Sequence, residues 1–161
     1  MNLFKIPDIE EAEAEILNNK GIFQNFPATI NFPFPERYKK IVTRIRTIEL
    51  ASEAILFSSV ESANENKESG FREHWCFAAN GQGDRWFLDR NENVFFYDHD
   101  EESLQPMDIH FDQWLQMAFI IHQLDRYFDE LDEIPEPVQQ DFYAALNGIH
   151  PGLSENYPFR I

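Results

Sequence analysis

The chain has 161 residues, 43% of them hydrophobic, and contains 16 Phe, 5 Tyr and 3 Trp. This length and composition predict a single folded domain, residues 1–161, with a core rich in phenylalanine. The formal net charge of −16 argues against nucleic acid and anionic membranes as direct ligands, because their phosphates are bound by Lys and Arg. A basic protein is the expected partner.

The cysteine content and the N-terminal residues predict a cytoplasmic protein. Cys76 is the only cysteine, so neither an intramolecular disulfide nor a zinc site made of thiolates is expected. The first residues turn acidic without a long apolar stretch, which argues against a secretory signal. No apolar window reaches the length of a membrane-spanning helix. No cofactor or metal site is predicted.

Residues 1–50 are expected to be largely helical. Asp8 is placed to cap a helix over residues 9–19, whose early glutamates favour a helix N-terminus, and Gly21 would end it. The acidic face of this helix is interpreted as solvated, with a partner-binding surface as the alternative. Residues 23–35 mix Phe with Pro, which predicts an extended segment pinned to the body by its phenylalanines, or alternatively a docking peptide.

A second helix is expected from Glu36 to about Arg46. It carries a group of basic side chains that is interpreted as internal charge compensation, with a patch for phosphate or another acidic ligand as the alternative: Arg37, Lys39, Lys40, Arg44 and Arg46.

An antiparallel sheet of about four to six strands is expected over residues 53–100. Residues 53–60 predict its first strand, and residues 61–70, which lack a large apolar side chain, predict a mobile surface loop. Three further strands follow, separated by Asn80-Gly81 and by the polar residues 89–93, which favour tight reversals. The buried-strand context of Cys76 predicts a buried thiol.

C-terminal helices are expected over residues 108–147. The first begins near Asp108, after the connection that contains residues 104–107, and ends near Asp132. It is apolar on most sides and must therefore bury two faces. His122 on this helix is interpreted as a core or boundary residue. A last helix starts at Glu136 or Pro137 and stops at Asn147-Gly148, and residues 149–161 form an irregular tail.

The predicted α+β domain resembles a known family over roughly residues 76–117. Gly83-Asp84 enters an aromatic strand, the hairpin that follows ends in Val94-Phe95-Phe96-Tyr97-Asp98-His99-Asp100, and Phe111-Asp112-Gln113-Trp114-Leu115 opens a helix. This order is similar to that of the SUKH superfamily, which includes yeast glucan-synthesis regulators and many bacterial immunity proteins. The resemblance implies an immunity-type protein that binds and neutralises a cognate toxin, such as a nuclease with a basic active-site surface.

Residues 98–102, Asp-His-Asp-Glu-Glu, form the most chemically suggestive cluster. Strand alternation predicts Asp98 and Asp100 on one side and His99 on the other. A carboxylate pair in a pocket can perform acid–base work or bind a cation, but the simpler interpretation is an acidic strand end that runs into an exposed turn. Asp89-x-Asn91-x-Asn93 begins like a calcium loop, but Val94 replaces the required glycine, so a hairpin turn is predicted.

These observations favour a non-enzymatic protein-binding domain whose acidic surface meets a basic partner. Charge selects the candidate contacts, which are Asp84, Asp89, Glu92, Asp98, Asp100, Glu101 and Glu102. One alternative is a regulatory scaffold domain, as the yeast members of the resembled family imply. Another is an uncharacterised hydrolase or metal-dependent enzyme that uses the cluster at residues 98–102.

Overall fold

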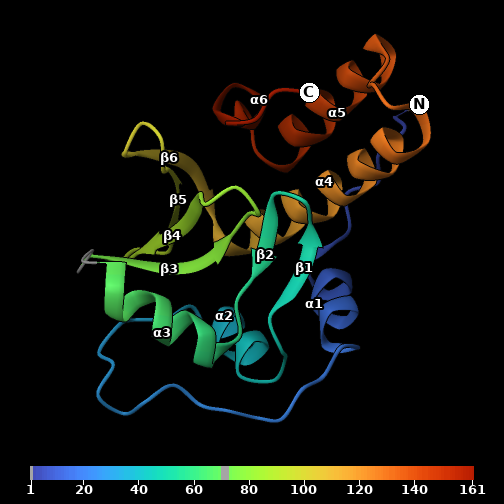
Figure 1. Ribbon diagram of the computed structural model, residues 1–161. Coiled ribbons are helices and arrows are strands. Elements are labelled where there is room, and N and C mark those ends of the chain that lie inside the picture. Colours follow the sequence, from blue (N-terminus) through green and yellow to red (C-terminus); the bar gives the residue numbers. More distant parts are fainter. Residues whose placement is uncertain (1, 70–72) are drawn as a thin grey trace.

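A six-stranded antiparallel sheet forms the centre of the protein in the computed structural model, which describes residues 2–69 and 73–161 (Figure 1). Each strand pairs with its neighbour in sequence, so the sheet is a meander. The strands are β1 (Ile48–Ala51), β2 (Ala54–Leu56), β3 (His74–Ala79), β4 (Arg85–Asp89), β5 (Asn93–Asp98) and β6 (Ser103–His110). The predicted α+β class and strand number are therefore confirmed.

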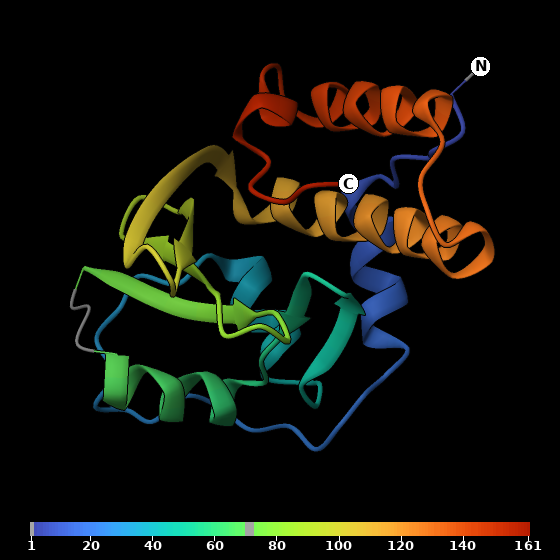
Figure 2. The same ribbon diagram turned by 45° about the horizontal axis from the view of Figure 1, so that its top comes forward.

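Helices pack on one face of this sheet and beside one of its strands. Figures 1 and 2 show α4 against one face with α5 outside it, and α3 running beside β3. None of the helices in the described ranges combines the length and the apolar character that a membrane crossing requires. The helices are α1 (Ile9–Leu17), α2 (Glu36–Val42), α3 (Ser59–Ser69), α4 (Phe111–Leu131), α5 (Glu136–Ile149) and α6 (Leu153–Asn156).

The main core lies between the sheet and α4, and aromatic rings fill much of it. Trp114 of α4 meets Phe77 of β3 edge to face, with ring centroids 4.7 Å apart, and lies 5.9 Å from Trp86 of β4. The indole N–H of Trp86 donates to the carbonyl of Glu53 at 2.8 Å, which ties β4 to the β1–β2 turn. Because α4 packs against both the sheet and α5, the predicted burial of two faces is confirmed.

The N-terminal region follows the sequence pattern in part: α1 begins after Asp8 as predicted, but α2 ends at Val42 and not near Arg46. The Asp8 carboxylate accepts from the N–H of Glu11 at 2.8 Å and caps α1. The Phe-Pro segment is irregular, and Phe26 stacks on Phe34 with centroids 4.3 Å apart. Ion pairs between α1 and α2, from Arg37 and Lys40 to Glu13 at 3.0 and 2.9 Å, provide internal charge compensation.

The prediction of a mobile loop over residues 61–70 is wrong for the residues that the structure describes, because these belong to α3. Polar side chains anchor this helix in place of apolar ones. The Asn66 amide accepts from the N–H of Cys76 at 2.8 Å and donates to the carbonyl of Cys76 at 2.8 Å. The Ser62 hydroxyl donates to the same carbonyl at 2.6 Å. Cys76 is buried as predicted, and this burial raises the pKa of its thiol to about 12.

The sheet extends beyond the predicted residues 53–100 at both ends. β1 lies within the part expected to be helical, and β6 occupies Ser103–His110, where a connection and a helix start at Asp108 were expected. The strand predicted over residues 53–60 is the shorter β2, because Ser59 and Val60 already belong to α3. Pro106 is tolerated because β6 is an edge strand. Asp108 adopts a φ of 59° within the strand and does not cap a helix. The helix α4 begins three residues later, at Phe111.

Three expectations for the C-terminal part are also wrong. His122 is exposed on α4, not in the core or at its boundary. The helix α5 continues through Asn147-Gly148 to Ile149, and Gly148 packs closely against Ile6, since an added Cβ would lie 3.0 Å from the Cδ1 atom of Ile6. The tail over residues 149–161 is not entirely irregular, since it contains the short helix α6.

We expect Asn66→Ala to lower the free energy of unfolding by about 1–3 kcal/mol, because both backbone groups of Cys76 lose the partner that Asn66 provides. Equilibrium urea denaturation measures this change. Asn64→Ala, at an exposed position of the same helix, is the matched control and should change stability by less than about 0.5 kcal/mol. Equal stabilities of the two variants would contradict the anchoring role of Asn66.

Candidate functional site

The meander places three hairpin turns at one end of the sheet. Hydrogen-bonded registers align one residue from each of five strands in a row across the sheet: Ile55, Ala79, Arg85, Tyr97 and Leu104. The β1–β2, β3–β4 and β5–β6 turns all lie beyond this row, at the upper end of the sheet in Figure 1. The β4–β5 turn lies at the opposite end.

Acidic side chains gather at this end and form what we call the acidic rim: Glu53, Asp84, Asp98, Asp100, Glu101 and Glu102. Five of the seven contacts predicted from charge are in the rim. The other two, Asp89 and Glu92, belong to the β4–β5 turn, which lies roughly 17 Å away along β5. The three consecutive residues 100–102 are exposed and carry the most accessible charge of the rim.

Asp84 is the least exposed member of the rim, at 8%, and it connects two turns. One carboxylate oxygen accepts from the Asn80 amide at 3.0 Å within the β3–β4 turn. The other accepts from the backbone N–H of His99 at 3.1 Å and lies 2.6 Å from its Nδ1. Burial opposes ionisation of this carboxyl, but the hydrogen bonds from Asn80 and His99 outweigh burial and hold its pKa below the usual value.

The ring of His99 lies on the same side of the turn as the carboxylates of Asp84 and Asp100. The prediction that His99 faces away from its acidic neighbours is therefore wrong. The strand β5 ends at Asp98, and His99 belongs to the turn, where strand alternation no longer applies. Its Nδ1 faces Asp84, and its Nε2 lies 3.2 Å from a carboxylate oxygen of Asp100. The hydrogen bond to Asp84 and the charges of the nearby carboxylates raise the pKa of His99.

Asp84, Asp98 and His99 each offer one possible ligand atom within 4.8 Å of the others. These atoms already have partners in the protein. The carboxylate of Asp98 accepts from the backbone N–H groups of Asp100 and Glu101 at 2.9 and 3.2 Å, and Asp84 is bonded to His99. The cluster therefore holds the turn together through its own hydrogen bonds.

Residues 89–93 form a hairpin turn, as predicted, and Asp89 organises it. The Asp89 carboxylate accepts from the N–H groups of Asn91 and Asn93 at 2.8 and 2.9 Å and from the Asn93 amide at 3.1 Å. Glu92 is exposed and adopts a φ of 69°, in the left-handed region. Its side chain is free to meet a partner, whereas that of Asp89 is engaged in the turn.

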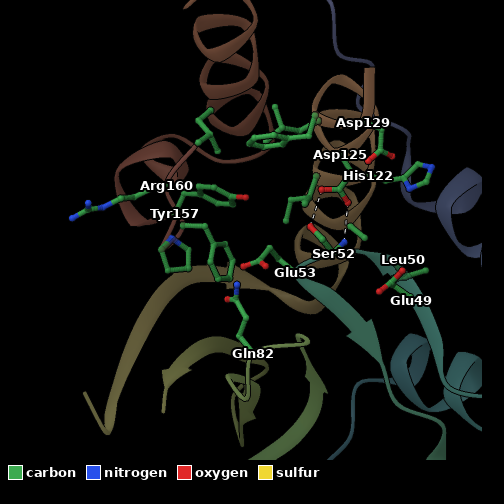
Figure 3. A pocket seen from close by; sticks show the side chains of 17 residues that line it. Glu49, Leu50, Ser52, Glu53, Gln82, His122, Asp125, Asp129, Tyr157 and Arg160 are labelled. Atoms are coloured by element: carbon green, nitrogen blue, oxygen red, sulfur yellow. Dashed lines mark hydrogen bonds between the residues drawn. The ribbon is translucent and has the colours of Figure 1, made fainter. Parts of the chain in front are cut away.

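A pocket of about 740 Å³ lies beside the rim, between the β1–β2 turn, α4 and the C-terminal tail (Figure 3). Glu53 is half-buried in its wall. Burial, together with the charges of Asp84 and Asp125, raises the pKa of Glu53 to about 7, although a hydrogen bond from Asn80 opposes the shift. Asp125 of α4 accepts from the N–H and the hydroxyl of Ser52 at 2.8 and 2.7 Å and fixes the β1–β2 turn.

Sequence reasoning missed this pocket. Glu53 was placed in a strand, Asp125 in an apolar helix and Tyr157 in a tail, and no short motif joins segments that lie so far apart in the chain. The hydrogen bonds between Ser52 in a turn and Asp125 on a distant helix produce no periodic pattern in the sequence.

No family model matches the chain, and the comparisons with curated proteins and with solved structures find no match either. The resemblance to the SUKH superfamily therefore stays a prediction from the residues quoted above.

We expect Asp84→Asn to lower the pKa of His99 towards the ordinary histidine value of about 6.5, because the largest cause of its shift is lost. An NMR titration of the imidazole measures this change. Asp89→Asn, at the other end of β5, is the control and should leave the pKa of His99 where it is. A His99 titration that is the same in wild type and Asp84→Asn would contradict the pairing.

The same pair sets a pH window for stability. The raised pKa of His99 means that its contribution is present below about pH 6.5 and is lost as pH rises through the folded-state value. The lowered pKa of Asp84 means that its contribution is present above about pH 3.9 and is lost as pH falls through the folded-state value. Wild type should therefore lose its advantage over Asp84→Asn in thermal unfolding at both extremes of pH.

Proposed function

We propose that this chain is a non-enzymatic binding domain that recognises a basic protein through its acidic rim. The observation that carries the proposal is the convergence of three hairpin turns at one end of the sheet, each bringing carboxylates to the same edge. A surface of one sign of charge steers a partner of the opposite sign and accelerates its association.

The net charge of the whole chain has the same sign as the charge of the rim. Its formal net charge is −16, so the rim adds to a long-range negative potential instead of opposing one. Exposed carboxylates at Asp100, Glu101 and Glu102 stand at the outer edge of the rim, where an approaching surface meets them first. Asp84 and Asp98 hold the two turns in shape behind them.

An immunity-type role is the specific form that we propose: the rim covers the basic surface of a toxin, such as a nuclease, and so neutralises it. This form rests on the resemblance of roughly residues 76–117 to the SUKH superfamily and on the charge of the rim. The carboxylates at residues 98–102 favour binding over catalysis, because Asp98 is engaged with the backbone of its own turn and the three that follow are exposed.

The partner can be sought by affinity capture from the native cell lysate at low and at moderate salt, with mass spectrometry to identify bound proteins. We expect one basic protein at near-equal stoichiometry, retained less well as salt rises. Recovery of neutral or acidic proteins whose retention does not depend on salt would contradict the proposal.

Neutralising the outer rim should slow association with that partner. We expect the triple variant Asp100→Asn, Glu101→Gln, Glu102→Gln to lower the association rate roughly tenfold at low salt and to weaken its salt dependence, as stopped-flow kinetics can measure. The control removes the same amount of charge from α1, at Glu10, Glu11 and Glu15, and should retain most of the wild-type rate. Identical rates for the two triple variants would show that the rim is not the contact surface.

A further inference from the structure

The pocket beside the rim is lined by carboxylates from two separate parts of the chain. Two flank the β1–β2 turn and two lie on α4, namely Glu49, Glu53, Asp125 and Asp129. Arg160 and His122 are the basic side chains of the lining, and Figure 3 shows the Arg160 guanidinium directed away from Glu53 and Tyr157. Acidic side chains therefore outnumber basic ones in the lining, four to two.

Aromatic rings form another wall. Tyr157 and Phe159 of the tail line the pocket, with their ring centroids 5.3 Å apart, and Tyr157 also packs against Phe142. Figure 3 shows the Tyr157 hydroxyl directed towards the space that Glu53 and Asp125 border. This hydroxyl has no hydrogen-bond partner among residues 2–69 and 73–161, although the ring is largely packed in the protein.

Carboxylates beside aromatic rings suit a planar organic cation. A guanidinium group has five N–H donors that reach carboxylates on different elements, and it also stacks on aromatic rings. A lysine ammonium is a compact point charge that gains less from the aromatic wall. A metal ion gains nothing from Tyr157 or Phe159. The volume of about 740 Å³ lies within the usual range for ligand pockets and exceeds what a bare ion needs.

We propose that this pocket binds the guanidinium group of an arginine side chain that the basic partner inserts. The inference rests on the proposed function, since the rim brings the partner to the same end of the sheet. Glu53 and Asp125 accept N–H groups of the guanidinium, Tyr157 offers its ring and its hydroxyl, and no covalent bond is formed or broken.

Binding of the cation is coupled to a proton. Glu53, with its pKa raised to about 7, is protonated in a large fraction of molecules at neutral pH, and a guanidinium favours its ionised form. A proton and an arginine therefore compete, so affinity rises as pH rises through 7. The charged and titratable groups around Glu53 are Asp84 from the β3–β4 turn, Glu49 from β1, His122, Asp125 and Asp129 from α4, and Tyr157 and Arg160 from the tail.

The test uses the full chain and two small probes whose α-amino groups are acetylated, so that the side chain is the only group that differs in charge. These are Nα-acetylarginine amide and its neutral isostere Nα-acetylcitrulline amide, called arginine amide and citrulline amide below. NMR shifts of Glu53, Tyr157 and their neighbours report binding. We expect arginine amide to shift pocket signals saturably and citrulline amide to bind at least tenfold more weakly. The affinity for arginine amide should rise about tenfold between pH 6 and pH 8.

Glu53→Gln keeps the shape of the side chain and removes its charge. We expect this variant to bind arginine amide about tenfold more weakly and to lose most of the pH dependence. Glu92→Gln, at the far end of the sheet, is the matched charge control and should bind like wild type. His122→Gln, at another position of the lining, is a second control and should retain the pH dependence.

The outcomes separate this inference from the proposed function. Equal binding of citrulline amide, or pH dependence that survives in Glu53→Gln, would overturn the guanidinium site. Absence of any pocket shift with arginine amide, together with capture of a basic partner that depends on residues 100–102, would overturn the pocket and leave the rim as the interface. Specific binding of arginine amide by a protein that captures no basic partner would support the pocket and overturn the proposed function.

Discussion

Strand connectivity is the constraint on which the rest of this structure depends. In a meander, alternate turns must lie at the same end of the sheet, so the β1–β2, β3–β4 and β5–β6 turns share one end. Acidic residues that are spread over 50 positions of the sequence, from Glu53 to Glu102, become neighbours for this reason alone. Topology therefore brings Glu53 and Asp84 to the end of the sheet where the acidic run at residues 98–102 lies. The helix α4 then brings Asp125 to the same place from the other side of the core.

Carboxylates that lie close together repel one another and are partly desolvated. The structure offsets this electrostatic cost in two ways. Where a carboxylate has donors, as Asp84 has in Asn80 and His99, hydrogen bonds hold it ionised in spite of burial. Where donors are few, as at Glu53, the carboxyl group keeps its proton to a higher pH, with a pKa of about 7. The first arrangement gives a stable turn, and the second gives a group that gains from the arrival of a positive charge. A rigid rim next to a pocket that responds to charge suits recognition of a basic surface.

Sequence patterns predicted the parts of this fold that depend on neighbours in the chain. Turn chemistry at Asn80-Gly81 and Asp89 placed two hairpins, Asp8 placed a helix start, and the all-round apolarity of α4 predicted its central position. The helix α3 was missed because Asn66 anchors it through amide hydrogen bonds to a strand ten residues away. The strand β6 was missed because Pro106 and Asp108 are poor strand residues whose place depends on being at an edge. The charge of the sequence predicted five residues of the acidic rim. The pocket could not be predicted, because Glu53, Asp125 and Tyr157 meet only through tertiary packing, which a single sequence does not reveal.

Recognition of positive charge by one end of the sheet is the central claim, and amide hydrogen exchange in the captured complex tests it most directly. The protein is compared with and without its basic partner, peptide by peptide, at low salt. The account predicts slower exchange in the β1–β2, β3–β4 and β5–β6 turns and in residues 157–161, with the β4–β5 turn and α1 unchanged. Protection confined to the β4–β5 turn or to α1, with the three turns of the acidic rim unaffected, would contradict it.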